Sequence, residues 1–339
     1  MRMPRSLLLS LLLGITLLLV WWVEGRMSSY FLTVAGFVGI NIILAVSLNI
    51  TNGFTGLFSL GHPAFMAVGG YVTAILTFPA MRKAMFLPDL PAWLAGLELP
   101  FLPALLTGGV MAVIVALFVG VPVLRLKGHY LAVATIGFLI IVQVLLKNME
   151  GWTRGPLGLS GLPAITNLWW ITLFVLACIV TAWRIKFSSF GRRLQAVREN
   201  EMAAQCIGMN LFLTRIQALC VGAFFAGVAG GLWAHLVTVI TPNSFSLVMA
   251  FSIVVMVVVG GSGSVTGSVL GATVVTLLTE VFRPMEERLG LYGMSEVLMS
   301  LILLLILILR PKGIFGTDEP RFLLPDEYRG RQRTENREH

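Results

Sequence analysis

Residues 101–124 read FLPALLTGGVMAVIVALFVGVPVL, a run of 24 residues without a charged side chain. A helix needs about 20 apolar residues to cross a hydrocarbon layer of about 30 Å, because each residue adds about 1.5 Å to its length. This run therefore predicts a membrane-spanning helix. Apolar runs of comparable length recur along the chain, and the ten expected spans are 7–23, 31–50, 54–78, 101–124, 129–146, 167–183, 214–238, 246–260, 264–282 and 295–310.

The composition of the whole chain supports the same fold class. Hydrophobic residues make up 57% of the 339 residues and charged residues only 12%, against about 25% charged residues in an ordinary soluble domain. We therefore expect an all-α polytopic membrane protein with about ten transmembrane helices in one domain, residues 1–316. Residues 317–339 mix both charge signs without apolar periodicity, so we expect a mobile, polar, cytoplasmic tail there.

The first apolar run follows Arg2 and Arg5, a charge order that secretory signal peptides share. The run 7–23 is longer than the apolar core of a signal peptide, which is about 7–15 residues long. The sequence Glu24-Gly25-Arg26 that follows offers no pair of small residues for cleavage. We therefore expect a retained first span.

The basic residues predict how the chain is oriented. Ten crossings place both termini on one side, and the segments of that side carry 17 of the 24 lysines and arginines, against 7 on the opposite side. Cytoplasmic segments are rich in Lys and Arg, so we expect both termini and the loop 184–213 in the cytoplasm and the chain in the cell inner (plasma) membrane. Residues 79–100, with four prolines, should form an ordered outer loop that does not span. The net charge of +8 then reflects orientation among membrane lipids, and we expect no nucleic-acid partner.

Two segments interrupt the apolar sequence with glycine and hydroxyl residues, at 49–63 and at 260–268. Broken backbone at membrane depth occurs only where protein or a water-filled cavity satisfies its polar groups, and glycine-interrupted segments in transporters point to the substrate path. Two cytoplasmic turns between adjacent spans explain the pattern equally well. The candidates for a translocation path are Gly53, Gly56, Ser59, Gly61, His62, Gly261, Gly263 and Ser264.

Small residues also recur at every fourth position, in two sets. Such spacing lets helix backbones approach closely in a membrane, where no hydrophobic force draws helices together. We therefore expect packing contacts at Ala223, Gly227 and Gly231 and at Gly263, Gly267 and Gly271.

The sequence carries no pattern of an enzyme or a metal site. The phosphate-binding pattern Gly-x-x-x-x-Gly-Lys-[Ser/Thr] is absent, and no two histidines have the i, i+4 spacing of a helical metal site. Cys178, Cys206 and Cys220 lack paired spacing and are interpreted as packing residues. We expect no catalytic residue, no cofactor and no metal in this chain, and any ATP hydrolysis must occur on separate subunits.

The ionisable residues near the spans bear on the mechanism of transport. Ion-coupled carriers keep ionisable groups well inside their spans. Here Glu280 and Glu296 lie near the ends of expected spans, and Arg215 begins one. This distribution disfavours an ion-coupled carrier without excluding it.

The loop 184–213 contains a short amphipathic pattern. One helical stripe consists of Met202, Ala203, Cys206 and Ile207, the polar side carries Arg198, Glu201 and Gln205, and Gly208 suits a C-terminal cap. A helix on the membrane surface explains this pattern, and so does a helix that docks into a groove of a partner protein. In the docking interpretation, Arg198 and Glu201 fix the register through charged contacts at the rim of the groove.

Six short motifs together resemble a known family. They are SLGHPAF at 59–65, GHYLA at 128–132, GPLGLSG at 155–161, the loop segment 192–208, SF at 244–245 and GGSGS at 260–264. Over roughly residues 35–316, the chain resembles the larger of the two permeases of branched-chain amino acid ABC importers.

This resemblance implies a type II ABC importer fold, similar to that of the vitamin B12 importer. It also implies a heterodimer with a second permease subunit, two cytoplasmic ATPase subunits and a periplasmic or lipid-anchored substrate-binding protein. The family's coupling segment is similar to the stretch with Glu201, Ala203, Ala204 and Gly208. The candidates for ATPase coupling are therefore Arg198, Glu201, Met202, Ala203, Ala204, Ile207 and Gly208.

The function that the resemblance implies is translocation of branched-chain, hydrophobic amino acids across the inner membrane. Similar permeases carry urea or short amides, which is one alternative. An ion-coupled secondary amino acid carrier is the other.

Overall fold

A computed structural model of the chain describes residues 20, 24–126, 128–289, 293–309, 313–316 and 319. Most of this part is helical. The helices are α2 Ser29–Leu48, α3 His62–Thr77, α4 Ala80–Phe86, α5 Ala92–Ala95, α6 Phe101–Val123, α7 His129–Asn148, α8 Glu150–Thr153, α9 Leu168–Phe187, α10 Ser189–Glu199, α11 Glu201–Cys206, α12 Leu211–Val237, α13 Leu247–Gly260, α14 Val265–Leu289 and α15 Met294–Leu309. A π-helical turn, Asn49–Gly53, continues α2, and the 3₁₀ turns are Gly155–Leu157 and Pro242–Ser244.

Short polar side chains and prolines set the beginnings of many helices. A side-chain oxygen of the residue before the helix accepts a backbone hydrogen bond from the first turn at α9, α10, α11, α12 and α13, where these caps are Asn167, Ser188, Asn200, Asn210 and Ser246. In the outer loop, Pro79, Pro91 and Pro100 directly precede α4, α5 and α6. The loop 79–100 is thus ordered into two short helices, and α4 is bent by 117° from α3.

The described residues contain fewer long apolar helices than the ten expected spans. Seven helices in this part are long and apolar enough to cross a membrane, or eight if the bent pair α3–α4 counts as one span. The expected span 7–23 lies outside the described residues except for position 20, and α15 has 16 residues. The expected span 54–78 is wrong at its start, because helix begins only at His62.

The centre of the bundle is formed by α3, α6 and α12, whose backbones touch at glycines. A methyl group at Gly69 of α3 would overlap the backbone of Gly227 of α12, and one at Gly108 of α6 would lie 2.6 Å from the carbonyl oxygen of Gly69. Gly267 and Gly271 of α14 are equally close to the backbone of α13. The predicted role in helix packing is confirmed for Gly227, Gly267 and Gly271, whereas Gly263 lies in the turn between α13 and α14.

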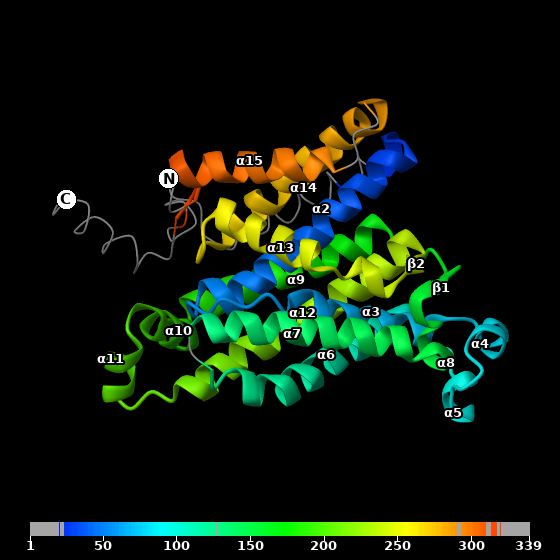
Figure 1. Cartoon of the computed structure of the whole chain (residues 1–339), viewed down its shortest axis with the longest axis horizontal. Helices are drawn as coiled ribbons and strands as arrows, with labels where there is room; N and C mark the ends of the chain where they lie inside the picture. Colours follow the sequence, from blue (N-terminus) through cyan, green and yellow to red (C-terminus); the bar gives the residue numbers. More distant parts are fainter. Residues whose placement is uncertain are drawn as a thin grey trace, which may run out of the picture.

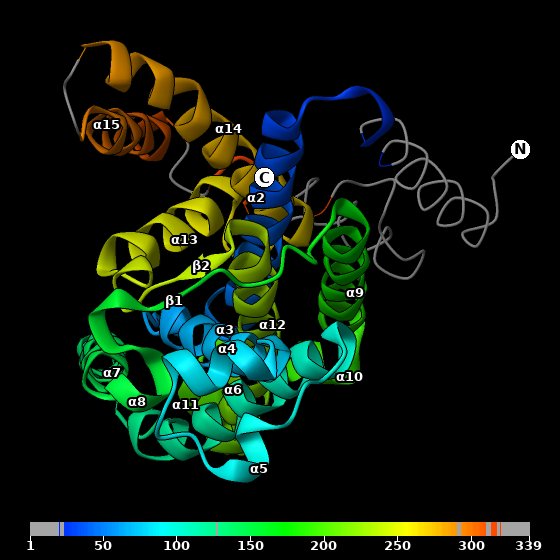
Figure 2. The ribbon, with the colours of Figure 1, turned by 90° about the vertical axis from the view of Figure 1, so that its right-hand side faces the viewer.

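The two ends of the bundle differ. In Figure 1, α10 and α11 lie at one end, while α4, α5, α8 and the strands β1 Leu159–Ser160 and β2 Val239–Ile240 lie at the opposite end. The strands pair antiparallel, with Leu159 opposite Ile240. Figure 2 shows α2 between the α3–α6–α12 core and the group α13, α14 and α15. The loops expected on opposite membrane faces therefore lie at opposite ends of the molecule.

Candidate functional site

The first glycine segment turns back into the bundle. Nε2 of His62, the first residue of α3, lies 2.8 Å from Oγ of Ser47 in α2. Ser47 precedes Gly53, where the π-helical turn ends, by six residues, or about 9 Å along a helix axis. The non-helical residues 54–61 therefore run back alongside α2, and α3 starts inside the bundle.

Side chains of the protein satisfy the backbone of this broken segment. The Leu60 N–H donates to Oγ1 of Thr135 in α7 over 3.0 Å, and the Asn52 side chain donates to the Ser59 carbonyl over 2.9 Å. This is the arrangement that non-helical backbone at membrane depth requires.

The second glycine segment is a tight turn between α13 and α14. Gly261 and Gly263 have φ values of +115° and +101°, which only glycine adopts without strain. The two segments thus differ in structure, since the first is re-entrant and the second joins two adjacent helices. Whether either lines the substrate path stays a prediction.

Asn49 joins the two segments, which are far apart in sequence. Its Nδ2 donates to the Ser264 carbonyl over 2.9 Å, and its Oδ1 accepts from the Gly263 N–H over 2.8 Å. A methyl group at Gly53 would lie 2.8 Å from the nitrogen of Gly263. The glycines therefore allow α2 and the α13–α14 turn to meet backbone to backbone.

Arg198 of α10 contacts both segments. Its guanidinium donates to the carbonyl of Gly53 over 2.7 Å and to that of Ser262 over 3.3 Å. Gly56, with φ of +72°, packs against the stem of the same side chain. The Arg198 side chain is thus turned inward to carbonyls near the ends of two helices, and its expected role at the rim of a partner's groove stays a prediction.

The predicted short amphipathic helix is present as α11. Asn200 caps its start by accepting from the Ala203 N–H over 3.0 Å, and Gly208, with φ of +81°, ends it. Ala204 is buried, whereas Met202 is 73% and Ile207 70% exposed.

One charged residue of α11 contacts the rest of the protein. Glu201 pairs with the buried guanidinium of Arg215 at the start of α12. Ala203 and Cys206 are exposed together with Met202 and Ile207, so the apolar stripe points away from the bundle. The role of this stripe in ATPase coupling stays a prediction.

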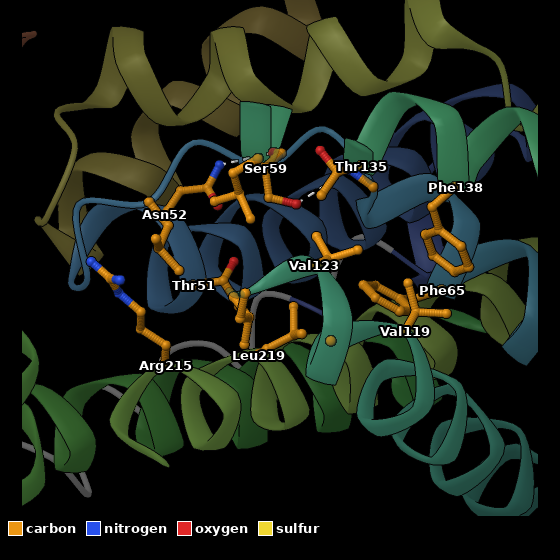
Figure 3. Close-up of a pocket in the computed structure, with 15 residues that line it drawn as sticks. Thr51, Asn52, Ser59, Phe65, Val119, Val123, Thr135, Phe138, Arg215 and Leu219 are labelled. Atoms are coloured by element: carbon orange, nitrogen blue, oxygen red, sulfur yellow. Dashed lines mark hydrogen bonds between the residues drawn. The ribbon is translucent and has the colours of Figure 1, made fainter. Parts of the chain in front are cut away.

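A small cavity lies beside the re-entrant segment, between α3, α6, α7 and α12 (Figure 3). Its volume of about 20 Å³ is room for about one water molecule. Of the predicted path residues, it is lined by Ser59 and Gly61. Among the described residues, Nε of Arg215 and Oδ1 of Asn52, two further lining residues, meet no hydrogen-bond partner.

Three residues of this region were not singled out from the sequence. They are Asn49, Lys186 at the end of α9, and Glu319. Glu319 is 4% exposed, so this residue beyond position 316 is buried against the bundle. Asn49 could have been found from the sequence, because an asparagine at the end of an apolar run is unusual. Glu319 could not, because a single acidic residue in a charged tail gives no such signal.

Comparisons with known proteins agree with the resemblance. Residues 30–309 match the family model described as branched-chain amino acid transport system / permease component. The high-affinity branched-chain amino acid transport system permease protein LivM of Salmonella typhimurium is 29% identical over 319 residues, with 84% of this chain and 70% of the relative covered. The protein of the same name in Escherichia coli K12 is 29% identical over 322 residues, with the same coverage.

A third relative has another named substrate. The autoinducer 2 import system permease protein LsrC of Salmonella typhi is 31% identical over 163 residues, which cover 44% of this chain and 46% of the relative. No solved structure matches the chain. Because the family model spans most of the chain, this protein belongs to the family of permease components of branched-chain amino acid transport systems.

Proposed function

We propose that this chain is a permease subunit of an ATP-binding cassette importer that carries branched-chain amino acids across the cell inner membrane. It would pair with a second permease, bind two cytoplasmic ATPase subunits and receive substrate from a periplasmic or lipid-anchored binding protein. Family membership and the names of the relatives support the substrate class and the type of transporter. The chain itself would break no covalent bond.

The observation that carries this proposal is the geometry of α10 and α11. The helix α11 exposes Met202 and Ile207 at one end of the bundle, a surface that an amphipathic helix offers to a groove. The preceding helix α10 carries Arg198, which contacts Gly53 and Ser262. A partner seated on α11 would thus be one helix away from both glycine segments.

Energy coupling follows from these contacts in our proposal. ATP binding and hydrolysis on the partners displace α11. Two charged links receive the displacement, namely Glu201 to Arg215 of α12 and Arg198 to the carbonyls of Gly53 and Ser262. The spans that bear the glycine segments, α2, α3, α13 and α14, then rearrange around the substrate. Polar side chains such as Ser59 and His62 would line its path.

Ala203→Arg tests the docking surface. A charge placed in an apolar docking face is buried without a partner on association, a defect that typically costs about 3–5 kcal/mol and therefore more than a hundredfold in affinity. The variant should insert in the membrane and bind the second permease but lose ATPase association and leucine uptake together.

Gln205→Arg is the matched control, because Gln205 is exposed on the same helix but outside the apolar stripe. It should retain co-purification of the ATPase and uptake. If Ala203→Arg also retains both, α11 is a surface helix and the proposed coupling is wrong.

A competition assay tests the substrate class. The test is needed because a partial relative is named as a permease for another substrate, autoinducer 2. In vesicles with the complete complex, unlabelled isoleucine and valine should inhibit uptake of labelled leucine, and urea and acetamide should not. Inhibition by urea alone would favour the amide alternative, and uptake that follows an ion gradient without ATP would favour a secondary carrier.

A further inference from the structure

The segment after α15 is bound to the turn between α13 and α14. We name residues 313–316 together with Glu319 the C-terminal strap. The Ile314 N–H donates to the Val259 carbonyl over 2.9 Å, and the Phe315 N–H donates to that of Gly260 over 3.1 Å. A methyl group at Gly261 would lie 2.5 Å from the carbonyl oxygen of Gly316. The strap therefore lies backbone to backbone along the end of α13.

Glu319 fastens the strap to the start of α14. Its carboxylate accepts from the backbone N–H of Val265 over 2.6 Å and from the hydroxyl of Thr266 over 2.5 Å. A carboxylate at this position satisfies N–H groups that the first helical turn leaves free and is favoured by the helix dipole.

Lys186 completes the arrangement from α9. Its Nζ lies 2.7 Å from the Glu319 carboxylate and donates to the Gly263 carbonyl over 2.7 Å. Lys186 is 7% exposed and Glu319 4%. Both charges are thus buried and hydrogen-bonded on several sides, so a neutral side chain in place of Glu319 removes a charged contact from the turn.

The α13–α14 turn is consequently held by four elements. Asn49 of the π-helical turn after α2 binds Gly263 and Ser264, and Arg198 of α10 binds the Ser262 carbonyl. Lys186 of α9 and Glu319 of the strap hold the remaining side. If α10 moves, Arg198 would pull on this turn. The movement would reach α14 only if the turn keeps its shape.

We propose that Glu319 is a positioning residue of the transport cycle: it keeps the α13–α14 turn rigid, so that movement of α10 is transmitted to α14. The proposal rests on the proposed function of the chain. Without the Glu319 carboxylate, the turn gives way locally and the movement is lost before it reaches the span. ATP is then hydrolysed with less substrate transported.

The test is the ratio of leucine uptake to ATP hydrolysis in the complete reconstituted complex with Glu319→Gln. Glutamine keeps the size of the side chain and one acceptor oxygen, so the complex should assemble with normal ATPase association. The ratio should fall several-fold. Lys186→Met should also lower the ratio, and the double variant should lower it by less than the two single effects combined, because the two changes share the Lys186–Glu319 ion pair.

The matched control is Glu280→Gln, on the same helix α14. Glu280 pairs with the exposed Arg283 and lies away from the strap, so the ratio should stay at the wild-type value. An unchanged ratio for Glu319→Gln would overturn the proposal. A parallel loss of ATPase association, hydrolysis and uptake would also overturn it, since it would assign Glu319 a purely structural role.

A second measurement is independent of transport and hence of the proposed function. Ser262→Cys places a thiol at a half-buried position of the turn, and its rate of maleimide labelling reports how rigid the turn is. Combination with Glu319→Gln should raise this rate several-fold, and combination with Glu280→Gln should not. Equal labelling rates with and without Glu319→Gln would overturn the proposed role of Glu319. If the wild-type complex shows no ATP-dependent uptake of leucine, only the proposed function is rejected.

Discussion

Gly69 lies where the backbones of α3 and α12 touch, and it has no room for a side chain. In Gly69→Ala the added methyl group would overlap Gly227, so the two helices must separate. Overpacking of this kind typically costs about 1–3 kcal/mol. We expect a lower thermal unfolding temperature in detergent and a smaller yield of monodisperse protein.

Gly137→Ala is the control for this prediction. Gly137 lies within α7, and no described atom beyond its chain neighbours and the adjacent backbone of its own helix lies within 4 Å of the position that its methyl group would take. The substitution should be neutral or stabilise by up to about 1 kcal/mol, because alanine favours the helix. Equal destabilisation by both variants would mean that helix propensity, and not close packing, determines the effect.

Asn49 forms the direct side-chain link between the two glycine segments. Asn49→Ala removes both of its hydrogen bonds and leaves the Gly263 N–H and the Ser264 carbonyl without this partner. A buried polar group left unsatisfied costs about 1–3 kcal/mol. We expect a loss of leucine uptake of at least about tenfold, which corresponds to about 1.4 kcal/mol.

The control here is Asn148→Ala. Asn148 is exposed and donates to the Val144 carbonyl of its own helix, so its removal should change stability by less than about 0.5 kcal/mol. Wild-type uptake in Asn49→Ala would show that the two segments work independently.

Some of these residues could be recognised in the sequence and others could not. Gly208 was predicted as a helix cap and Gly227 as a packing residue, because local spacing alone carries that information. Asn49, Arg198 and Glu319 each bind backbone groups that are distant in sequence. Backbone groups have no sequence signature, so these three roles depend on the fold.

At the scale of elements, the outer helices α4 and α5 are joined by a buried lysine. Nζ of Lys83 donates to the carbonyls of Leu94 and Leu97 over 3.3 and 2.5 Å. Burial lowers the pKa of Lys83, and the nearby Glu98 opposes this shift in part. The two hydrogen bonds of Lys83 therefore offset part of the free energy that burial of its ammonium group costs.

Lys83→Met keeps the apolar stem of the side chain and removes these donors. We expect faster cleavage at residues 87–97 by chymotrypsin added from the outside, because α5 loses its tie to α4. Met81→Gln, at a neighbouring position that is 90% exposed, should cleave at the wild-type rate. If the two variants and the wild type are cleaved equally, Lys83 does not hold the loop.

Element boundaries followed from the sequence where the apolar pattern was uninterrupted. The expected span 101–124 corresponds to Phe101–Val123, and the expected end at residue 260 is the end of α13. The hydropathy pattern failed at residues 54–61, which are apolar enough for a helix but are not helical. This segment contains Gly56 and Gly61, and its Leu60 N–H bonds to Thr135 instead of to a helical carbonyl. Hydropathy measures burial, and a buried extended segment has the same hydropathy as a buried helix.

For the whole molecule, a native cysteine reports the orientation. Cys206 on α11 is exposed, whereas Cys178 is buried and Cys220 is half-buried. A membrane-impermeant maleimide should label the wild-type chain in inside-out vesicles and leave it unlabelled in intact cells. In the Cys206→Ser variant this labelling should disappear.

Trp93→Cys in the Cys206→Ser background gives the opposite control. Trp93 is 71% exposed on α5, at the other end of the bundle, and a cysteine there should react in intact cells. Labelling of Cys206 from outside would reverse the topology and remove α11 from the ATPase side. The charge pattern predicts this orientation, and the labelling experiment tests it.

The close contact of α3 with α12 also has a consequence for how the protein is made. The ribosome completes α3 at Thr77 but begins α12 only at Leu211. At about 5–20 residues per second, the interval is roughly 7–27 seconds. During this time the face of α3 with Gly69 and Gly70, which contacts α12 in the folded protein, is not covered by α12. We expect a nascent chain stalled before Leu211 to cross-link from α3 to lipid or to the insertion machinery, and one stalled well after Val237 to lose that cross-link.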